Sequence, residues 1–411
     1  MKTYTYDKSQ ALFQRATKVI PAGIYGHLGP SEGCFVPVDA YPFYIDRAEG
    51  AYFWDVDGNR FIDYMCAYGP IVLGYNHPQV DEAFRKQAEK ADCAILPSEK
   101  MVELAETLVD TIESADWAFF AKNGGDVTNL AVMTARAHTG RKRIVKFAGG
   151  YHGVTQWTQG AGSPGIIEED YEQVLTIPFN DVVALYDTFK RYRGEIACVI
   201  ATPYHHPAMA DNALPKPGFW KQVREMCTKE DVVLIVDDVR AGFRLDTKGS
   251  DYHYGFKADL ICYCKALANG YNISALCGGE EFKKAASNVF YTGSYWLSAA
   301  PMAAAIETIN ILKEMDGAKV MTELGKKLTK GLEETATKHG YHLKVTGEPS
   351  MWFMRLTDDD SGILHQKWIS ECVRRGVFFT NHHNLFMNTA MTDEDIKFTL
   401  EVADEAFRAM K

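Results

Sequence analysis

Four short runs of apolar, mostly β-branched residues constrain the fold of this chain more than any other feature. They read RIVKFAG, IACVIA, VVLIVDD and DLICYCK, and stretches with helical patterns separate them. This alternation is typical of βαβ units, in which helices cover both faces of a mostly parallel sheet. Ligands in such sheets bind beyond the carboxyl ends of the strands. The residues that follow each run are therefore candidates for a functional site.

The chain has 411 residues, which exceeds a usual single core, so we expect two packed domains. We place an N-terminal segment of helix and hairpin at residues 1–60, packing with the small domain. The large domain is expected at 61–302 and a smaller α+β domain at 303–411. Two hydrophobic runs around a DG turn predict a hairpin within residues 50–65.

Composition excludes several classes of function. The formal net charge of -10 argues against a general nucleic-acid or anionic-membrane binder. The sequence contains no run of about 18 apolar residues, so we expect no membrane span. The N-terminus also lacks the apolar core of a secretory signal. The nine cysteines are scattered without CxxC pairs, which is typical of reduced thiols. We therefore expect a cytoplasmic protein.

Two charged residues come at the ends of neighbouring apolar runs. Asp237 ends one run and Lys265 ends the next along the chain. The simpler interpretation of Lys265 is that its aliphatic stem is buried while its amine reaches water. Asp237 and Lys265 could also form a structural ion pair. The same two side chains are what pyridoxal phosphate requires. The lysine would form the Schiff base, and the aspartate would keep the pyridinium nitrogen protonated.

The rest of a cofactor site is also represented. AKNGGDVTNLA places Gly124 and Gly125 where a helix opens, and free backbone N–H groups there favour a phosphate. In GGYHG, Tyr151 would cover the cofactor ring, with His152 beside it. Asp126 lies next to the glycines. Its carboxylate would repel a phosphate, so we expect it to turn away and cap the helix.

Several ordered motifs together resemble a known family. They include KVIPAGIYG, GAYFWDVDGNRFIDYMCAYGPIVLGYNHP, ARAHTGRKRIVKFAGGYHG, LIVDDVRAGFR, ADLICYCKALANGY and AMTDEDI. They are similar to those of class III, fold type I pyridoxal-phosphate aminotransferases, in particular the glutamate-1-semialdehyde 2,1-aminomutase branch. The resemblance implies an α/β fold with a mostly parallel, seven-stranded-type sheet in the large domain and a smaller α+β C-terminal domain.

The resemblance also implies a set of site residues. Lys265 would form the Schiff base and Asp237 would pair with the ring nitrogen. Ser294, with Thr292 as the next candidate, would reach the phosphate from a neighbouring subunit, so the resemblance implies a homodimer with shared active sites. A surface turn formed by the Ser294 hydroxyl is the alternative for this residue. The remaining cofactor-binding residues would be Gly124, Gly125, Asp126, Tyr151, His152 and Val239.

The implied activity moves an amino group from an amine or amino acid donor to a keto or aldehyde acceptor in ping-pong order. One alternative is an isomerase, either an aminomutase or a racemase. Another is a non-catalytic binding protein of the same fold, against which the retention of Lys265 and Asp237 argues. The C-terminal loop FFTNHHNLF offers histidines where the aminomutase pattern has an acidic residue, which weakens the aminomutase alternative.

Substrate-binding residues are less constrained by spacing. Arg240 and Arg244 could clamp a substrate carboxylate, or each could make a local ion pair. The histidine pairs at 205–206 and 382–383 lack the spacing of metal ligands, so we expect no metal. The residues that we expect at the substrate are Tyr25, His27, Tyr68, His205, Arg240, Trp296 and His383.

Overall fold

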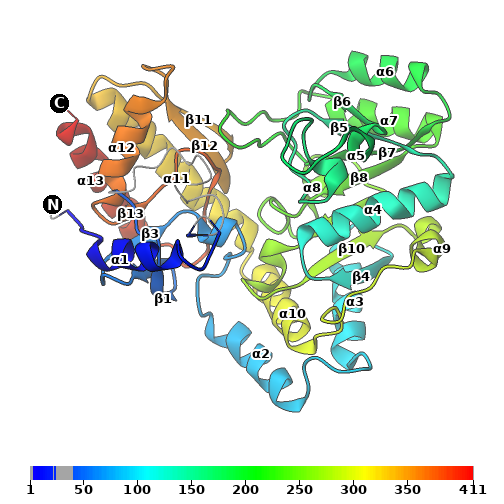
Figure 1. The fold of residues 1–411 in the computed structure, drawn as a ribbon, viewed down its shortest axis with the longest axis horizontal. Coiled ribbons are helices and arrows are strands. Elements are labelled where there is room, and N and C mark those ends of the chain that lie inside the picture. The colour runs from blue at the N-terminus through cyan, green and yellow to red at the C-terminus, as the bar shows by residue number, and fades with distance from the viewer. Residues whose placement is uncertain (1–2, 22, 25–39, 411) are drawn as a thin grey trace. The chain divides into compact units, whose positions relative to one another are not determined.

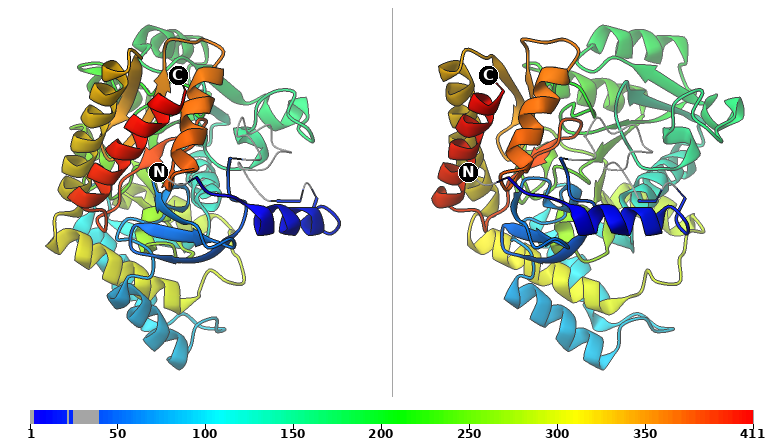
Figure 2. Two further views of the ribbon diagram at one scale, coloured as in Figure 1. Left: turned by 90° about the vertical axis from the view of Figure 1, so that its left-hand side faces the viewer. Right: turned by 60° about the vertical axis from the view of Figure 1, so that its left-hand side comes forward.

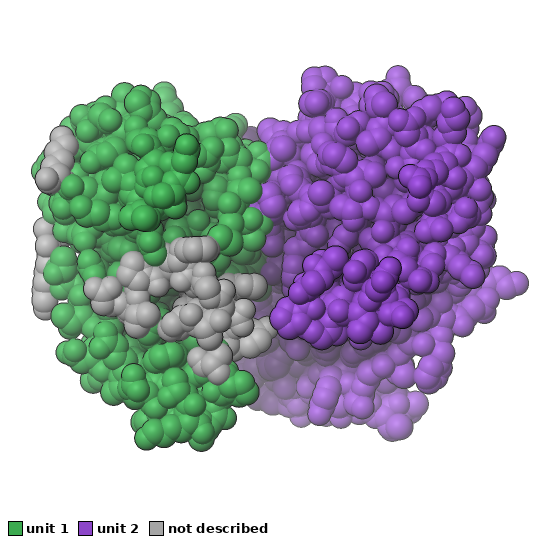
Figure 3. Space-filling view, turned by 45° about the horizontal axis from the view of Figure 1, so that its top comes forward, with its two compact units in different colours: residues 1–77, 208–212, 320–411 green, residues 78–207, 213–319 purple. Residues whose placement is uncertain are grey.

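The computed structural model describes residues 3–21, 23–24 and 40–410. The chain divides into two compact units, coloured separately in Figure 3. Unit 1 comprises residues 1–77, 208–212 and 320–411, and unit 2 comprises residues 78–207 and 213–319. The boundaries that we predicted after residues 60 and 302 fall earlier in the chain than those of these units.

Unit 2 is built on a seven-stranded sheet with the order β4-β10-β9-β8-β7-β5-β6. β10 runs antiparallel to its neighbours β4 and β9, and the pairs from β9 to β6 are parallel. The predicted mostly parallel sheet is therefore confirmed. Its strands are β4 (Trp117–Ala121), β5 (Arg143–Phe147), β6 (Val174–Ile177), β7 (Ile196–Ala201), β8 (Val233–Asp237), β9 (Leu260–Tyr263) and β10 (Ser274–Gly278).

Helices cover this sheet because its strands are apolar on both faces (Figure 1). Ile200 and Ile235 belong to the core that includes α4 (Gly124–Thr139). The next residues back along the same strands, Val199 and Leu234, belong to the core that includes α6 (Val182–Arg191) and α7 (Phe219–Glu230). The other helices of unit 2 are α2 (Pro78–Lys90), α3 (Glu99–Thr111), α5 (Glu168–Tyr171), α8 (Ser250–His253), α9 (Glu280–Asn288) and α10 (Ala299–Glu314).

Unit 1 contains two small sheets, with the orders β1-β2-β3-β13 and β11-β12-β14. The predicted hairpin is present as β2 and β3, and β11 and β12 form a second antiparallel pair. The strands are β1 (Ile45–Glu49), β2 (Tyr52–Asp55), β3 (Arg60–Asp63), β11 (Leu343–Glu348), β12 (Met351–Leu356), β13 (Val377–Phe378) and β14 (Leu385–Phe386). The helices are α1 (Asp7–Ala16), α12 (Ile363–Val373), α13 (Asp393–Ala409) and α11 (Gly317–Lys338), whose first residues belong to unit 2. Figure 2 shows α11 and α13 from two further directions.

Local signals set the ends of several helices. Gly140 ends α4 in the left-handed conformation, with φ of 69°, as its position predicts. Thr392 caps α13 by accepting the N–H of Asp395. The helical pattern between α10 and α11 is interrupted at Asp316, whose φ is 53°. Among the described helices, none is both long and apolar enough to cross a membrane.

Candidate active site

Lys265 and Asp237 lie at the same edge of the unit 2 sheet. Asp237 is the last residue of β8, and Lys265 comes two residues after the end of β9. The two strands are parallel, and Asp237 is paired in register with Cys262. The backbone of Lys265 is in the left-handed region, with a φ of 37°, and this residue begins the 3₁₀ turn η4 (Lys265–Ala268). Both side chains therefore stand where this architecture binds ligands.

The surroundings of Lys265 favour a neutral amine. The side chain is partly buried, and desolvation lowers the pKa of its ammonium group to about 8. Arg240 and Arg244 lower the pKa further by charge repulsion, while Cys264 and Asp237 oppose them. An amine with such a pKa is partly unprotonated near neutral pH, which is the form that attacks a carbonyl.

Asp237 is buried at this edge and its carboxylate is hydrogen-bonded. The side chain is buried, with 4% of its surface exposed. Its Oδ2 lies 2.7 Å from Nδ1 of His152, and its Oδ1 accepts the backbone N–H of Val239 at 3.2 Å. A carboxylate accepts hydrogen bonds, so Nδ1 of His152 carries the proton. Nε2 of His152 is buried and has no hydrogen-bond partner in the described part of the chain.

Asp238, the next residue, has different partners. Its Oδ1 accepts from Oγ of Ser250 at 2.5 Å, and its Oδ2 accepts the Ser250 N–H at 3.1 Å. Burial raises the pKa of its carboxyl to about 7, with Asp251 and Asp237 adding to the effect. Asp238 is thus held by a structural contact, and Asp237 is the carboxylate that pairs with His152.

The phosphate-binding turn predicted from the sequence opens α4. The first N–H groups of this helix, at Gly124 and Gly125, have no acceptor within the helix. A Cβ on Gly124 would lie 2.7 Å from Cγ1 of Val239, so only glycine fits there without a shift. The nearest atoms to a Cβ on Gly125 are 3.6 Å away. Asp126 turns back as expected, and its Oδ2 accepts the N–H of Asn123 at 2.8 Å.

Three further predicted cofactor residues are exposed. Tyr151 follows β5 and is 56% exposed. The predicted cross-subunit donors, Thr292 and Ser294, are both exposed as well. Cys93 points its thiol at the carbonyl of Ser294, with 3.6 Å between sulfur and oxygen.

Arg240 is hydrogen-bonded to His206, a contact that is neither the substrate clamp nor the local ion pair considered from its sequence position. Its Nη1 donates to the carbonyl oxygen of His206 at 2.9 Å and lies 3.1 Å from Nδ1 of the same residue. Arg244 is completely buried. His205 stacks on Phe179, with 5.5 Å between ring centroids.

The remaining predicted substrate residues are dispersed. Trp296 packs against the core of unit 2, near Phe119. Tyr68 and His383 belong to unit 1, where their rings meet edge to face at 5.2 Å. Tyr25 and His27 lie outside the described residues.

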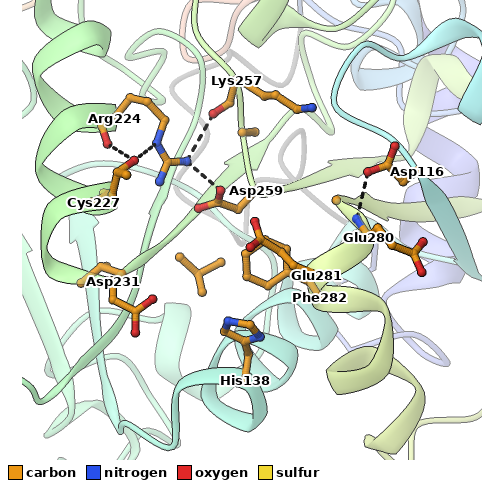
Figure 4. A pocket seen from close by; sticks show the side chains of 15 residues that line it. Asp116, His138, Arg224, Cys227, Asp231, Lys257, Asp259, Glu280, Glu281 and Phe282 are labelled. Atoms are coloured by element: carbon orange, nitrogen blue, oxygen red, sulfur yellow. Dashed lines mark hydrogen bonds and ion pairs between the residues drawn. The ribbon is translucent and has the colours of Figure 1, made fainter.

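Figure 4 shows a cavity of about 540 Å³ in unit 2. Neither Lys265 nor Asp237 lines it. It is lined by residues at the opposite ends of β8 and β9, among them Val233 and Asp259. Arg224 pairs with Asp259 at 2.8 Å, and Asp259 also accepts the N–H of Leu234 at 2.7 Å. These charged groups link the starts of β8 and β9. The cavity is therefore at the opposite ends of the strands from the candidate active site.

Sequence reasoning missed two partnerships. His152 was placed only as a neighbour of Tyr151, and its bond to Asp237 spans 85 residues. His206 was assigned no partner, although it binds Arg240. The available signal was that each histidine follows a strand of the same sheet.

This geometry defines an enzyme of the pyridoxal-phosphate class with fold type I. A lysine of lowered pKa, a buried aspartate on the neighbouring strand and a glycine turn opening a helix all fit that cofactor. The turn packs against Val239 so closely that a Cβ on Gly124 would lie 2.7 Å from Cγ1 of Val239.

The chain belongs to the class III aminotransferases. The family model described as "Aminotransferase class-III" matches residues 35–410. The chain is 42% identical over 403 residues to the aminopentol aminotransferase of Sphingopyxis macrogoltabida, covering 98% of this chain and 94% of that protein. It is 33% identical over 432 residues to the glutamate-1-semialdehyde 2,1-aminomutase of Desulforudis audaxviator (strain MP104C), covering 99% of each.

A solved structure is similarly close. It is described as the PLP internal aldimine form of the FumI protein of Sphingopyxis sp. MTA144, and it matches with a TM-score of 0.95. The two chains are 42% identical, and the match covers 98% of this chain and 96% of that one. The predicted family, fold class and enzyme class are therefore confirmed: the protein is an aminotransferase that depends on pyridoxal phosphate.

Proposed function

We propose that Lys265 is the residue that bonds to pyridoxal phosphate and that Asp237 holds its ring nitrogen. The observation that carries this assignment is their placement on adjacent parallel strands, with the pKa of Lys265 lowered to about 8. When bound, the cofactor supplies an electron sink for the carbon that bears the amino group. The free Nζ of Lys265 would accept the proton from that carbon and later return it.

Each of the other residues has a distinct task in this proposal. Val239 packs on one ring face, and Tyr151 covers the other. Gly124 and Gly125 donate their N–H groups to the phosphate, supported by the positive end of the α4 dipole. His152 fixes the orientation of the Asp237 carboxylate through the 2.7 Å contact.

Asp126 acts at a distance from the phosphate in this proposal. It caps the first turn of α4 through the N–H of Asn123 and so keeps the glycine N–H groups aligned.

We also propose that the active species is a homodimer in which Ser294, with Thr292 beside it, reaches the phosphate of the partner chain. Exposed apolar side chains near these residues support the assignment. Phe290 is 90% exposed and Tyr295 is 69% exposed. Large apolar groups exposed this close together are typical of an interaction surface.

The proposed reaction transfers nitrogen from an amine or amino acid donor to a keto or aldehyde acceptor in two half-reactions. The name of the 42% identical relative, an aminopentol aminotransferase, supports an amine donor. For the substrate side we propose Tyr25, His27, Tyr68, His205, Arg240, Trp296 and His383. Seven described cysteines have free thiols, which supports a cytoplasmic location: Cys93, Cys198, Cys227, Cys262, Cys264, Cys277 and Cys372.

A single-substrate experiment tests transfer against isomerisation. The purified holoenzyme is mixed with an amine in excess and no acceptor. Transfer predicts release of at most one ketone per active site, and further ketone only after a keto acid is added. Continuous formation of an isomer of the donor without any acceptor would contradict transfer.

A separate experiment tests the site assignment. Borohydride reduction of the holoenzyme, followed by peptide mass spectrometry, should place the cofactor on Lys265. Attachment to any other lysine would overturn the assignment.

A further inference from the structure

His206 makes a polar contact beside the catalytic edge that the proposed reaction does not use. It comes five residues after the end of β7 and is 7% exposed. Its Nδ1 lies 3.1 Å from Nη1 of Arg240, and its carbonyl oxygen accepts from the same Nη1 at 2.9 Å. A guanidinium group only donates hydrogen bonds, so Nδ1 is the acceptor and the ring proton resides on Nε2.

The surroundings keep the His206 ring neutral. Burial holds the pKa of the imidazole well below its ordinary value, and the nearby Arg240, His205 and His152 act in the same direction. A neutral ring remains an acceptor for the guanidinium throughout the physiological pH range. The contact with Arg240 is therefore permanent rather than switched by pH.

Arg240 is anchored from its backbone as well. It lies in the turn after β8, where the N–H of Gly242 donates to the carbonyl of Asp238 at 2.8 Å. The charged and titratable groups that act on Arg240 include Tyr204, Asp237 and Tyr151.

Groups of both positive and negative charge affect the pKa of the Lys265 amine. Arg240 and Arg244 carry positive charge, while Asp237 and the thiol of Cys264 act in the opposite sense. Arg244 is completely buried, which fixes its place. Arg240 is partly buried, and its two contacts to His206 fix the position of Nη1 at the end of the long side chain.

We propose that His206 is a positioning residue that holds the guanidinium of Arg240 beside the Lys265 amine, so that Arg240 serves the lysine as a fixed positive charge. A fixed cation disfavours the ammonium form of the lysine. Nη1 of Arg240 contacts both the carbonyl oxygen and Nδ1 of His206, and these two contacts carry the positioning role. The inference rests on the proposed role of Lys265.

The test measures Lys265 directly, in the full-length protein after removal of the cofactor. The protein is labelled with trinitrobenzenesulfonate between pH 6 and 11, and the rate at Lys265 is followed by peptide mass spectrometry. The exposed Lys284 in the same digest corrects for changes in the reagent. Only the neutral amine reacts, so the midpoint of the pH profile reports the protonation of Lys265.

Replacing His206 by Ala should raise this midpoint by about one pH unit, which is about a tenfold loss of neutral amine at pH 7. Arg240→Met should raise it at least as much. His206→Asn should restore most of the wild-type midpoint, because its Oδ1 can accept in place of Nδ1. His138→Ala is the control, since this exposed histidine on α4 lines the distant cavity.

An unchanged midpoint in His206→Ala would overturn the proposal, whether or not Arg240→Met changes it. Circular dichroism and thermal melts establish that the variants are folded. The pH midpoint of the visible absorbance of each holoenzyme gives a second reading and should rise in the same order. Borohydride labelling of the wild type at a lysine other than 265 would instead refute the proposed role of Lys265, so the two failures are distinguishable.

Discussion

Replacing Asp238 by Asn should make the protein more resistant to alkaline pH while leaving catalysis nearly intact. The carboxyl is 1% exposed and bonds to the hydroxyl and the N–H of Ser250. Burial raises its pKa from 3.8 to about 7. An Asn side chain can accept the Ser250 N–H through Oδ1 and donate to its hydroxyl through Nδ2, so the local contacts survive.

The magnitude follows from the difference in proton binding between the folded and unfolded states. Between pH 3.8 and about 7 the unfolded chain has lost the proton of Asp238 while the folded chain retains it. The folded state is therefore favoured most at low pH, and that advantage is lost as pH rises through the folded pKa. At ~1.36 kcal/mol per pKa unit, the full loss is about 4 kcal/mol, of which about 2.5 kcal/mol falls between pH 5 and 8.

Urea unfolding at pH 5 and pH 8 measures this quantity, with protein and cofactor concentrations held constant. From pH 5 to pH 8, the free energy of unfolding of the wild type should fall by about 2–3 kcal/mol more than that of Asp238→Asn. Equal changes in the two proteins would refute the reasoning.

The matched variant Asp237→Asn should lose at least about a hundredfold in kcat, because a neutral amide cannot stabilise a protonated ring nitrogen. Asp238→Asn should be much milder in kcat. If the effects on kcat were reversed, we would have assigned the wrong carboxylate to the cofactor.

Three further predictions concern the cofactor. Lys265→Ala should abolish turnover and the visible absorbance while preserving the circular dichroism, and near-normal transamination by this variant would exclude the lysine as the attachment point. Gly124→Ala should weaken cofactor binding at least several-fold because its Cβ would lie 2.7 Å from Val239, whereas Gly125→Ala, with its nearest atoms at 3.6 Å, should bind nearly normally; equal effects would argue against the close packing. Ser294→Ala should weaken cofactor retention by about 1.5–3 kcal/mol, the usual contribution of a hydrogen bond to a charged group. Mixed dimers of Lys265→Ala with a strongly cofactor-defective Ser294 variant should regain activity, and no recovery despite verified subunit exchange would mean that Ser294 does not serve the partner chain.

The sheet could be predicted from the sequence because hydrophobic patterns and turn residues act locally. The run IACVIA is β7 itself, Ile196–Ala201, and VVLIVDD contains all of β8. Gly140 ends α4 where its freedom to adopt a positive φ predicts. The break at Asp316 was not predicted, because residues on both sides of it suit a helix.

The sequence by itself also determined that Asp237 and Lys265 share an edge, since parallel strands end on the same side of a sheet. Only the tertiary structure decided what each charged group contacts. His152 reaches Asp237, Ser250 reaches Asp238, and the chain brings these partners together over 85 and 12 residues. The separation of residues along the sequence does not predict such contacts, because they depend on how loops fold over the sheet.

The pKa of Lys265 has the same origin. The run around this lysine places it at the end of a buried strand, but the lowering of its pKa to about 8 is caused mainly by desolvation, to which residues elsewhere in the chain contribute. Arg240 adds its charge from the turn after β8, and its Nη1 contacts His206 in the loop after β7. A lysine at the end of a strand is a property of the sequence, whereas a reactive amine arises only when the folded chain removes water and places charges around it.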